Sequence, residues 1–214
     1  KAASEETAFL HLRDEIASLL SSYSFIIVHG GGAEVSKVSE VFGLKPSFKD
    51  GIRMTTPEEM EIVDMVLAGK VNKHLVRILN TRLKAVGLSG SDGLLFTGES
   101  LEKDVRNGTR TGEITSVDPT VLKLLVANDY VPVIASTSMN TQGKALNINA
   151  DEAALHLAAG IPVTHLVFLS DIPGIVSNGE VISTLNESQA KKHIDDGIIT
   201  GGMIPKVRSS LNAL

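Results

Sequence analysis

The sequence predicts an α/β fold, a three-layer α/β/α sandwich with a mainly parallel central sheet. Short apolar or β-branched runs alternate along the chain with segments whose apolar residues have helical spacing. Strands that alternate with helices form parallel pairs, because each helix carries the chain back to the start of the next strand. The same alternation places helices over both faces of the sheet.

The strands of this sheet are predicted from four apolar runs, which cover residues 25–28, 85–88, 131–135 and 166–169. Apolar runs of this length, bounded by turn residues, indicate buried strands. Residues 94–115 differ from these runs because they are polar and include Asn107-Gly108. This segment is predicted to be either a hairpin or a mobile excursion.

Helices are predicted between the strands. The first has one apolar face, formed by Phe9, Leu12, Ile16, Leu19 and Leu20. Thr56 and Glu59 have the spacing of a capping box, and Pro57 stands at the first helical position. The long helix that begins there is expected to be interrupted near Gly69 and to resume to about residue 83. The remaining helices are predicted over residues 118–128, 149–160 and 187–193.

The composition excludes several classes of protein. The 214 residues allow one large domain or two small ones. The net charge of −5 and the absence of tryptophan and of a basic stripe argue against a nucleic-acid surface. No apolar run reaches the ~18 residues of a membrane helix, and no export signal opens the chain, so we expect a cytoplasmic protein. The chain has no cysteine, which excludes disulfides and thiol catalysis, and its histidines lack metal-site spacing, so no metal ligands are predicted.

A glycine-rich loop, His29-Gly30-Gly31-Gly32, follows the first predicted strand and precedes a segment with helical spacing. Bare backbone N–H groups at a helix N-terminus bind anions, so this loop indicates an anion site. The alternative is a tight turn without a ligand, because glycine also serves turn geometry. The loop is not a P-loop, and Val35 stands where a dinucleotide-binding fingerprint needs a glycine.

Three further loops have the same character, at residues 87–93, 170–174 and 200–206. Ligands of parallel α/β sheets bind at the carboxyl ends of the strands, where such loops lie. Each loop alone is explained by a turn. Together they predict a polyanion site, with a nucleoside triphosphate held without a P-loop.

Polar residues at two places are unusual for a purely structural role. Asn147 alternates with Asn149 across Ile148, as side chains at a strand end do, and Asp151 enters the following helix. Asn149 or Asp151 alone is also explained as a helix cap. Arg53 follows a glycine-containing turn and is either a solvated arginine or a clamp for a carboxylate.

These motifs resemble the amino acid kinase family and, within it, the acetylglutamate kinases. The matching stretches extend in order from Val28 to Val207. They include "VHGGGAEV", "GIRMTTPEEMEIVDMVLAGKVNKHLV", "AVGLSGSDG", "GEITSVDP", "ALNINADEAA", "LSDIPGI" and "IDDGIITGGMIPKV". The most specific signals are "NINAD" and "GGMIPKV" in the correct order after "HGGG".

The resemblance implies ATP-dependent phosphorylation of the side-chain carboxylate of N-acetyl-L-glutamate, on the route to arginine. The substrate-binding residues that it implies are Gly30, Gly31, Gly32, Arg53 and Asn147. The implied catalytic residues are Lys206, on the ATP phosphates, and Asp151, which orients the catalytic lysine. The implied nucleotide-binding residues are Ser170, Asp171, Gly174, Gly202 and Lys206.

The resemblance also implies cofactors, lobes and partners. ATP would bind with Mg²⁺ held mainly by the nucleotide phosphates. Residues 1–135 would form a lobe for the acetylated amino acid, and residues 136–214 a lobe for ATP. The protein would be a homo-oligomer that binds these small molecules and neither nucleic acid nor membrane.

Two features of the family have no match in the sequence. The family opens with a strand that carries Lys-x-Gly-Gly, and it continues into further strands after the lysine motif. We expect the natural polypeptide to contain these segments. Two alternatives stay open: a kinase for N-acetyl-α-aminoadipate in lysine synthesis, and a non-catalytic nucleotide or amino-acid sensor. "GEITSVDP" favours the glutamate enzymes over the first, and the failed fingerprint disfavours a Rossmann dehydrogenase.

Overall fold

The computed structural model describes residues 2–49, 52–101, 108–169, 174–177, 180–199, 207 and 211. The chain forms two compact units, Lys1–Ala153 and Ala154–Leu214. None of the helices in these described ranges is long and apolar enough to cross a membrane. The boundary between these units follows Ala153, whereas the boundary between the lobes expected from the sequence follows residue 135. The division of substrate and ATP binding between those lobes stays a prediction.

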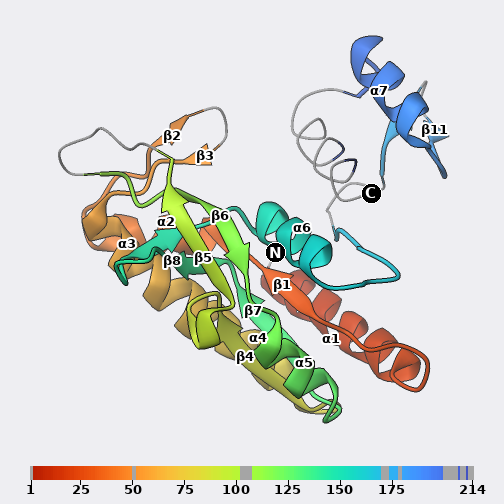
Figure 1. The fold of residues 1–214 in the computed structure, drawn as a ribbon, viewed down its shortest axis with the longest axis horizontal. Helices are drawn as coiled ribbons and strands as arrows, with labels where there is room; N and C mark the ends of the chain where they lie inside the picture. Colours follow the sequence, from red (N-terminus) through yellow and green to blue (C-terminus); the bar gives the residue numbers. More distant parts are fainter. Residues whose placement is uncertain are drawn as a thin grey trace. The chain divides into compact units, whose positions relative to one another are not determined.

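A parallel sheet of three strands forms the centre of the first unit (Figure 1). Its order is β1 (Ile27–His29), β7 (Val131–Ala135) and β4 (Ala85–Ser89), with Ile27 opposite Val133 and Ala85 opposite Val131. Every residue of β7 is buried, as expected for a middle strand covered on both faces. The predicted α/β fold with a parallel central sheet is therefore confirmed.

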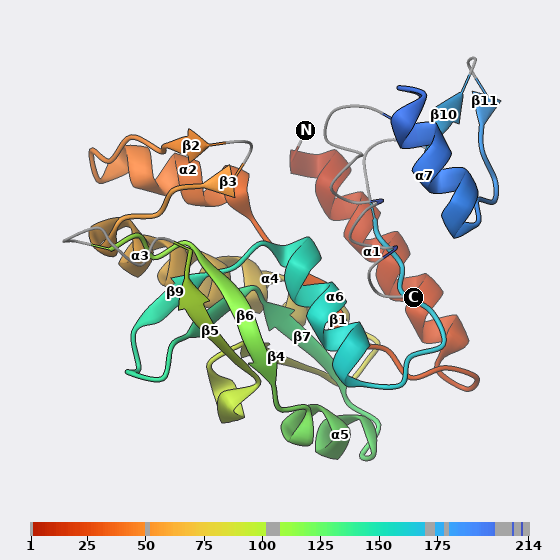
Figure 2. The same ribbon diagram turned by 45° about the horizontal axis from the view of Figure 1, so that its top comes forward.

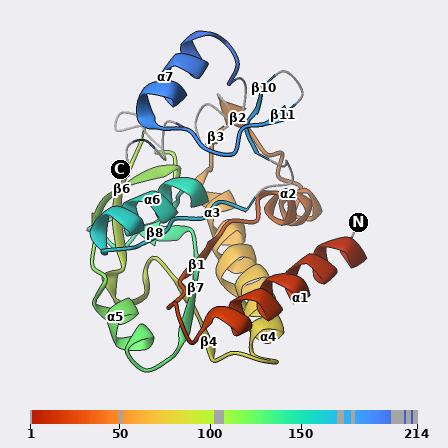
Figure 3. The same cartoon turned by 90° about the vertical axis from the view of Figure 1, so that its right-hand side faces the viewer.

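Helices cover both faces of this sheet. Figure 3 shows α1 (Ala2–Leu19) and α4 (Asn72–Leu79) on one side of the strands and α5 (Thr120–Val126) on the other. The core under α1 and α4 contains Ile16, Leu75, Leu79, Leu83, Ala85 and Val133. The apolar face predicted for the first helix is shorter than expected. The helix ends at Leu19, so Leu20 lies beyond it, and both side chains are about two-fifths exposed.

A second sheet continues from the first. Its order is β6 (Gly112–Val117), β5 (Phe96–Ser100), β8 (Thr137–Met139) and β9 (Ala145–Asn147). Residues 94–115 are predicted to form either a hairpin or a mobile excursion, and the antiparallel pair β5–β6 confirms the hairpin. A short 3-10 turn, η2 (Asp92–Leu94), precedes it. The chain passes from β7 into β8 at Ser136, whose N–H donates to the carbonyl of His29.

The predicted long helix consists of α3 (Pro57–Asp64), a π-helical stretch η1 (Met65–Val71) and α4. The interruption expected near Gly69 is thus a change of helix type. Thr56 caps α3 by accepting from the backbone N–H of Glu59, at 3.2 Å. The predicted capping box is only half formed, because the Glu59 carboxylate accepts from Arg53 instead of returning to Thr56.

A short hairpin lies beside the second helix. It consists of β2 (Phe48–Lys49) and β3 (Ile52–Arg53), and Figure 2 shows it alongside α2 (Gly32–Val41). The core beneath α2, α3 and η1 contains Val35, Met60, Ile62, Val63, Val66, Leu67 and Ala135. This core joins the helices around the glycine-rich loop to the end of β7.

The second unit contains most of α6 (Ala150–Gly160), the hairpin of β10 (Val176–Ser177) and β11 (Glu180–Val181), and α7 (Glu187–Asp195). Asn186 and Gln189 form a complete capping box at α7, which confirms the helix predicted over 187–193. The strand predicted over residues 166–169 is wrong, because the structure has no strand there. An apolar run becomes a strand only when another strand pairs with it, and Val167 and Leu169 are mostly exposed.

Candidate substrate and phosphoryl-binding site

The glycine-rich loop connects β1, which ends at His29, to α2, which begins at Gly32. A side-chain carbon on Gly31 would lie 2.9 Å from Leu67 Cδ2 and 3.2 Å from Val71 Cγ2, both in the π-helical stretch. A side-chain carbon on Gly30 would lie 3.3 Å from Ala150 Cβ. A side chain at Gly31 would displace the ends of Leu67 and Val71, and one at Gly30 would make a tight contact with Ala150, whereas no described atom lies within 4 Å of the same position on Gly32.

Arg53 lies against the start of α2 and is buried, with 8% exposure. Its Nη1 donates to Glu59 Oε1 at 2.7 Å, and Nη2 donates to the carbonyl of Gly32 at 3.0 Å and to Ser36 Oγ at 2.5 Å. The guanidinium also lies 4.8 Å from the centre of the Phe48 ring. Of the two interpretations of Arg53, a solvated arginine is wrong. The structure places this side chain at the glycine-rich loop.

A network of hydroxyl groups joins Arg53 to Asn147. Asn147 Nδ2 donates to Thr55 Oγ1 at 2.8 Å, and the Thr55 N–H donates to Thr111 Oγ1 at 2.9 Å. Thr111 Oγ1 in turn donates to the carbonyl of Arg53 at 2.6 Å. The structure thus brings together Gly32, Arg53 and Asn147, three of the residues predicted to bind substrate.

Asn149 is the cap of α6. Its Oδ1 accepts from the N–H groups of Asp151, at 2.8 Å, and of Glu152, at 3.3 Å. Asp151 lies in the first turn, where the helix dipole stabilises a carboxylate. Since the neighbouring Ala150 lies against Gly30, this helix start is at the glycine-rich loop.

The nucleotide side of the predicted site is described only in part. Ser170, Asp171, Gly202 and Lys206 lie outside the described residues. Gly174, in the second unit, has a φ of +141°, and a side-chain carbon there would lie 3.1 Å from Val181 Cγ1. Glycine at this position is therefore explained by the backbone, and its contact with a nucleotide stays a prediction.

The partners that hold the site together are not evident from the sequence. The spacing of Glu59 indicates only a helix cap, and neither Thr55 nor Thr111 is predicted to be a site residue. Thr55 and Thr111 are 56 positions apart in the chain, so their pairing leaves no local pattern. The repeated threonines around Thr55 and Thr111 were the one available signal.

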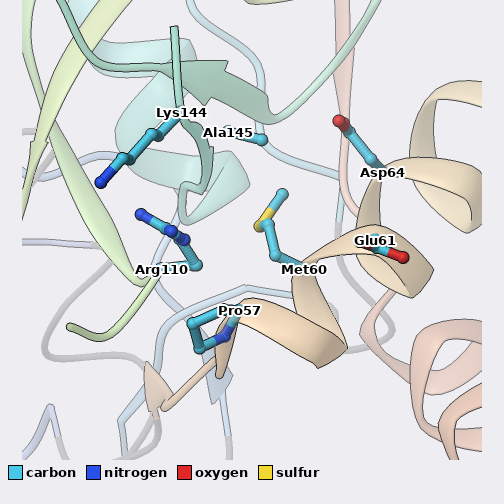
Figure 4. Close-up of a pocket in the computed structure, with 7 residues that line it drawn as sticks. All are labelled: Pro57, Met60, Glu61, Asp64, Arg110, Lys144 and Ala145. Carbon is cyan, nitrogen blue, oxygen red and sulfur yellow. The ribbon is translucent and has the colours of Figure 1, made fainter. Parts of the chain in front are cut away.

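A pocket of about 200 Å³ opens beside the start of α3. Figure 4 shows Arg110 and Lys144 extending to the same side of it, with Met60 between them and Asp64. The backbone of Arg110 donates to the carbonyl of Thr55 and accepts from the N–H of Asn147, both at 2.7 Å. The pocket therefore adjoins the network of Arg53 and Asn147 without containing either residue.

The chain is similar to known proteins over most of its length. The sequence matches the model of the amino acid kinase family over residues 2–214. It is 43% identical over 194 residues to the chloroplastic acetylglutamate kinase of Arabidopsis thaliana, which covers 88% of this chain and 56% of that protein. It is 40% identical over 195 residues to the acetylglutamate kinase of Bacillus pumilus (strain SAFR-032), with 91% of this chain and 75% of that protein covered.

A solved structure shares the fold. The crystal structure of smu.665 from Streptococcus mutans UA159 superposes with a TM-score of 0.81 at 26% identity, covering 96% of this chain and 83% of that chain. The family match extends over nearly every element described above, including the glycine-rich loop and the strand that ends at Asn147. The chain belongs to the amino acid kinase family.

Proposed function

We propose that the protein transfers the γ-phosphoryl group of ATP to the side-chain carboxylate of N-acetyl-L-glutamate. The product is N-acetyl-L-glutamyl 5-phosphate, an intermediate of arginine biosynthesis. The observation that carries this proposal is the identity of 43% and 40% to two proteins named acetylglutamate kinase, over 88% and 91% of this chain. The chain spans about half the length of the plant relative.

The reaction brings two anions together, since an ionised carboxylate attacks a phosphate. A protein accelerates such a transfer by positioning the reactants and by neutralising the charge on the moving group. Backbone N–H groups of the glycine-rich loop are suited to this role because they are already oriented before the substrates meet. No general base is needed, and Asp151 therefore orients the catalytic lysine instead of removing a proton.

Arg53 is proposed to bind the α-carboxylate of the substrate. A guanidinium has five N–H donors, and the described acceptors on Glu59, Gly32 and Ser36 use three of them. Both Nη2 donors are used, so Nε–H and one Nη1–H are left, and each is proposed to donate a single charge-assisted hydrogen bond to a substrate carboxylate. Asn147 is proposed as a second substrate contact, oriented by its hydrogen bond to Thr55.

ATP is proposed to bind with Mg²⁺ at the C-terminal lobe, residues 136–214, while residues 1–135 bind the acetylated amino acid. Among the described residues, no group of three His, Asp or Glu side chains could hold a metal ion. Mg²⁺ is commonly held by substrate phosphates with few protein ligands, and the ion is proposed to bind with the ATP phosphates. The nucleotide-binding roles of Ser170, Asp171, Gly174, Gly202 and Lys206 belong to this proposal, as does a homo-oligomeric state. A cytoplasmic location stays a prediction.

The proposed substrate is tested by measuring ADP release from the full-length protein with each candidate acceptor. We expect ATP-dependent ADP release with N-acetyl-L-glutamate and far slower release with N-acetyl-α-aminoadipate. The two acceptors differ by one methylene, which is worth about 10- to 200-fold in discrimination. A preference for N-acetyl-α-aminoadipate would instead support a kinase of lysine synthesis. ADP release with neither acceptor would support the non-catalytic sensor.

The glycines of the loop are predicted to have separable roles. Gly31→Ala pushes a methyl group into Leu67 and Val71, so we expect a loss of about 1–3 kcal/mol in the free energy of unfolding. Gly32→Ala meets no described atom and should leave stability within about 0.5 kcal/mol, yet lower turnover by crowding the phosphoryl group. Urea unfolding and steady-state kinetics of both variants measure this. Equal stability losses, or an unchanged turnover in Gly32→Ala, would contradict the assignment.

A further inference from the structure

Asn72 is a fully buried polar residue at the start of α4, directly after the π-helical stretch. Its side-chain nitrogen lies 2.8 Å from the carbonyl oxygen of Val133 in β7 and 3.0 Å from Nε2 of His29 in β1. The same nitrogen is 3.3 Å from the carbonyl oxygen of Leu88 in β4. One amide group therefore contacts all three strands of the parallel sheet, at the edge where the glycine-rich loop begins.

The Asn72 amide fits here because Gly87 has no side chain. A side-chain carbon on Gly87 would lie 2.0 Å from Asn72 Oδ1 and 2.7 Å from Lys73 Nζ. Lys73 Nζ donates to Asn72 Oδ1 at 3.1 Å and to the carbonyl of Gly87 at 3.0 Å. The acceptor end of the amide is thereby engaged, so its donor end faces the strands.

These contacts define the tautomer of His29. Its Nδ1 lies 2.9 Å from the carbonyl oxygen of Gly30, and a carbonyl only accepts, so Nδ1 carries the proton. Nε2 is then an acceptor, and it faces the donor nitrogen of Asn72. His29 is thus held neutral, with Nδ1–H bonded to the loop that follows it.

The bond to Gly30 orients one peptide group of the loop. In a planar trans peptide the C=O and the following N–H point in opposite directions. When His29 holds the carbonyl of Gly30, the N–H of Gly31 points away from His29. A hydrogen bond that starts at Asn72 therefore sets the direction of a backbone donor in the loop.

We propose that Asn72 is a positioning residue for phosphoryl transfer, because it holds His29 in the tautomer that orients the Gly30–Gly31 peptide. The inference rests on the proposed kinase activity, in which the N–H groups of this loop stabilise the transferred group. The effect of Asn72 reaches the reaction through His29, and Asn72 itself touches neither substrate. If the Gly31 N–H turns away, the hydrogen bond that it makes to the transferred group in the transition state is lost. Turnover then decreases more than substrate affinity.

Protonation of His29 opposes this arrangement. Burial lowers the pKa of His29 by more than the hydrogen bond to the Gly30 carbonyl raises it, and the positive charge of Lys73 lowers it further. A protonated imidazole would also direct an Nε2–H at the Asn72 donor. As the pH falls below about 6.5, the unfolded chain takes up this proton while the folded protein does not, so stability decreases with falling pH until the lowered pKa is reached.

The test compares Asn72→Leu and Asn72→Asp with a control at a more exposed asparagine, Asn80→Leu, in the full-length protein. Asn80 also ties its side chain to β4, through bonds of 3.0 and 2.7 Å to Ala85, but it does so at the strand end opposite the loop. We expect Asn72→Leu to lower kcat about 10- to 100-fold with nearly unchanged KM values for ATP and N-acetylglutamate. Asn80→Leu should lower the melting temperature without this loss of kcat.

Asn72→Asp puts a carboxylate oxygen opposite Nε2 and favours the imidazolium, so the acid limb of its kcat–pH profile should move to higher pH. A purely structural role would lower the melting temperature and leave that limb in place. Equal kcat losses in Asn72→Leu and Asn80→Leu at matched stability would overturn the proposal.

A second readout does not depend on activity. Nitrogen NMR of labelled histidine in the wild type should show His29 as the neutral Nδ1–H form to a lower pH than an exposed histidine, and Asn72→Leu should abolish this preference. An Nε2–H tautomer in the wild type would reject the inference even if the kinase assay succeeds. If the protein shows the Nδ1–H tautomer but has no kinase activity, the geometry of His29 is correct and the proposed function is refuted. The catalytic part of the inference rests on that function and would be refuted with it.

Discussion

Replacing Arg53 by alanine is expected to weaken the binding of N-acetylglutamate by about 2–5 kcal/mol, the range for removing one partner of a buried charge pair. ATP affinity should barely change, since Arg53 is assigned to the other substrate. The same substitution removes the partner of Glu59, a buried carboxylate with 3% exposure. We therefore expect an accompanying loss of about 3–5 kcal/mol in stability.

A double variant separates these two effects. Arg53→Ala combined with Glu59→Gln removes the buried charge together with its partner, so most of the stability should return while substrate binding stays weak. Arg53→Lys keeps the charge but loses the planar fork, and it should bind the substrate with intermediate affinity. Calorimetric titration with each substrate and urea unfolding measure both quantities. If the double variant binds N-acetylglutamate with wild-type affinity, the assignment of Arg53 to the substrate site is refuted.

Replacing Lys206 by methionine is expected to reduce turnover by about 10²–10³, the range seen when one preorganised donor is deleted. The substitution keeps the length of the side chain and removes its charge. Charge moves onto the oxygen that leaves the γ-phosphate during transfer, so an ammonium group there interacts more strongly in the transition state than before it. The KM for N-acetylglutamate should stay nearly unchanged. Wild-type turnover in Lys206→Met would refute the catalytic assignment.

The partnership of Lys206 with Asp151 is tested by adding Asp151→Asn. If Asp151 orients Lys206, the double variant should be much less impaired than the product of the two single losses, because the residues act as one unit. Steady-state kinetics of the wild type, both single variants and the double variant provides the comparison. Losses that multiply fully would show that the two residues act independently.

The elements that the sequence predicts well are those whose signal is local. Residues 131–135 form a strand with the predicted bounds because their side chains are apolar at every position, as a middle strand requires. Pro57 after Thr56 starts α3 where expected, since proline fits the first turn and threonine accepts from the N–H of Glu59. Residues 166–169 carry the same kind of apolar signal, and only the absence of a pairing strand among the described residues made that prediction wrong.

The candidate site divides in the same way. The sequence by itself determined the family, and the resemblance predicts Gly30–Gly32, Arg53 and Asn147 as substrate-binding residues from their types and order. Tertiary structure alone decided what each side chain does there. Leu67 and Val71 occupy the space that a side chain at Gly31 would need. The Glu59 carboxylate accepts from Arg53 instead of completing the helix cap. The Asn72 amide contacts His29 and the two neighbouring strands. The reason is physical: a buried polar group or a bare glycine is explained by atoms that lie close in space, and those atoms come from distant parts of the chain.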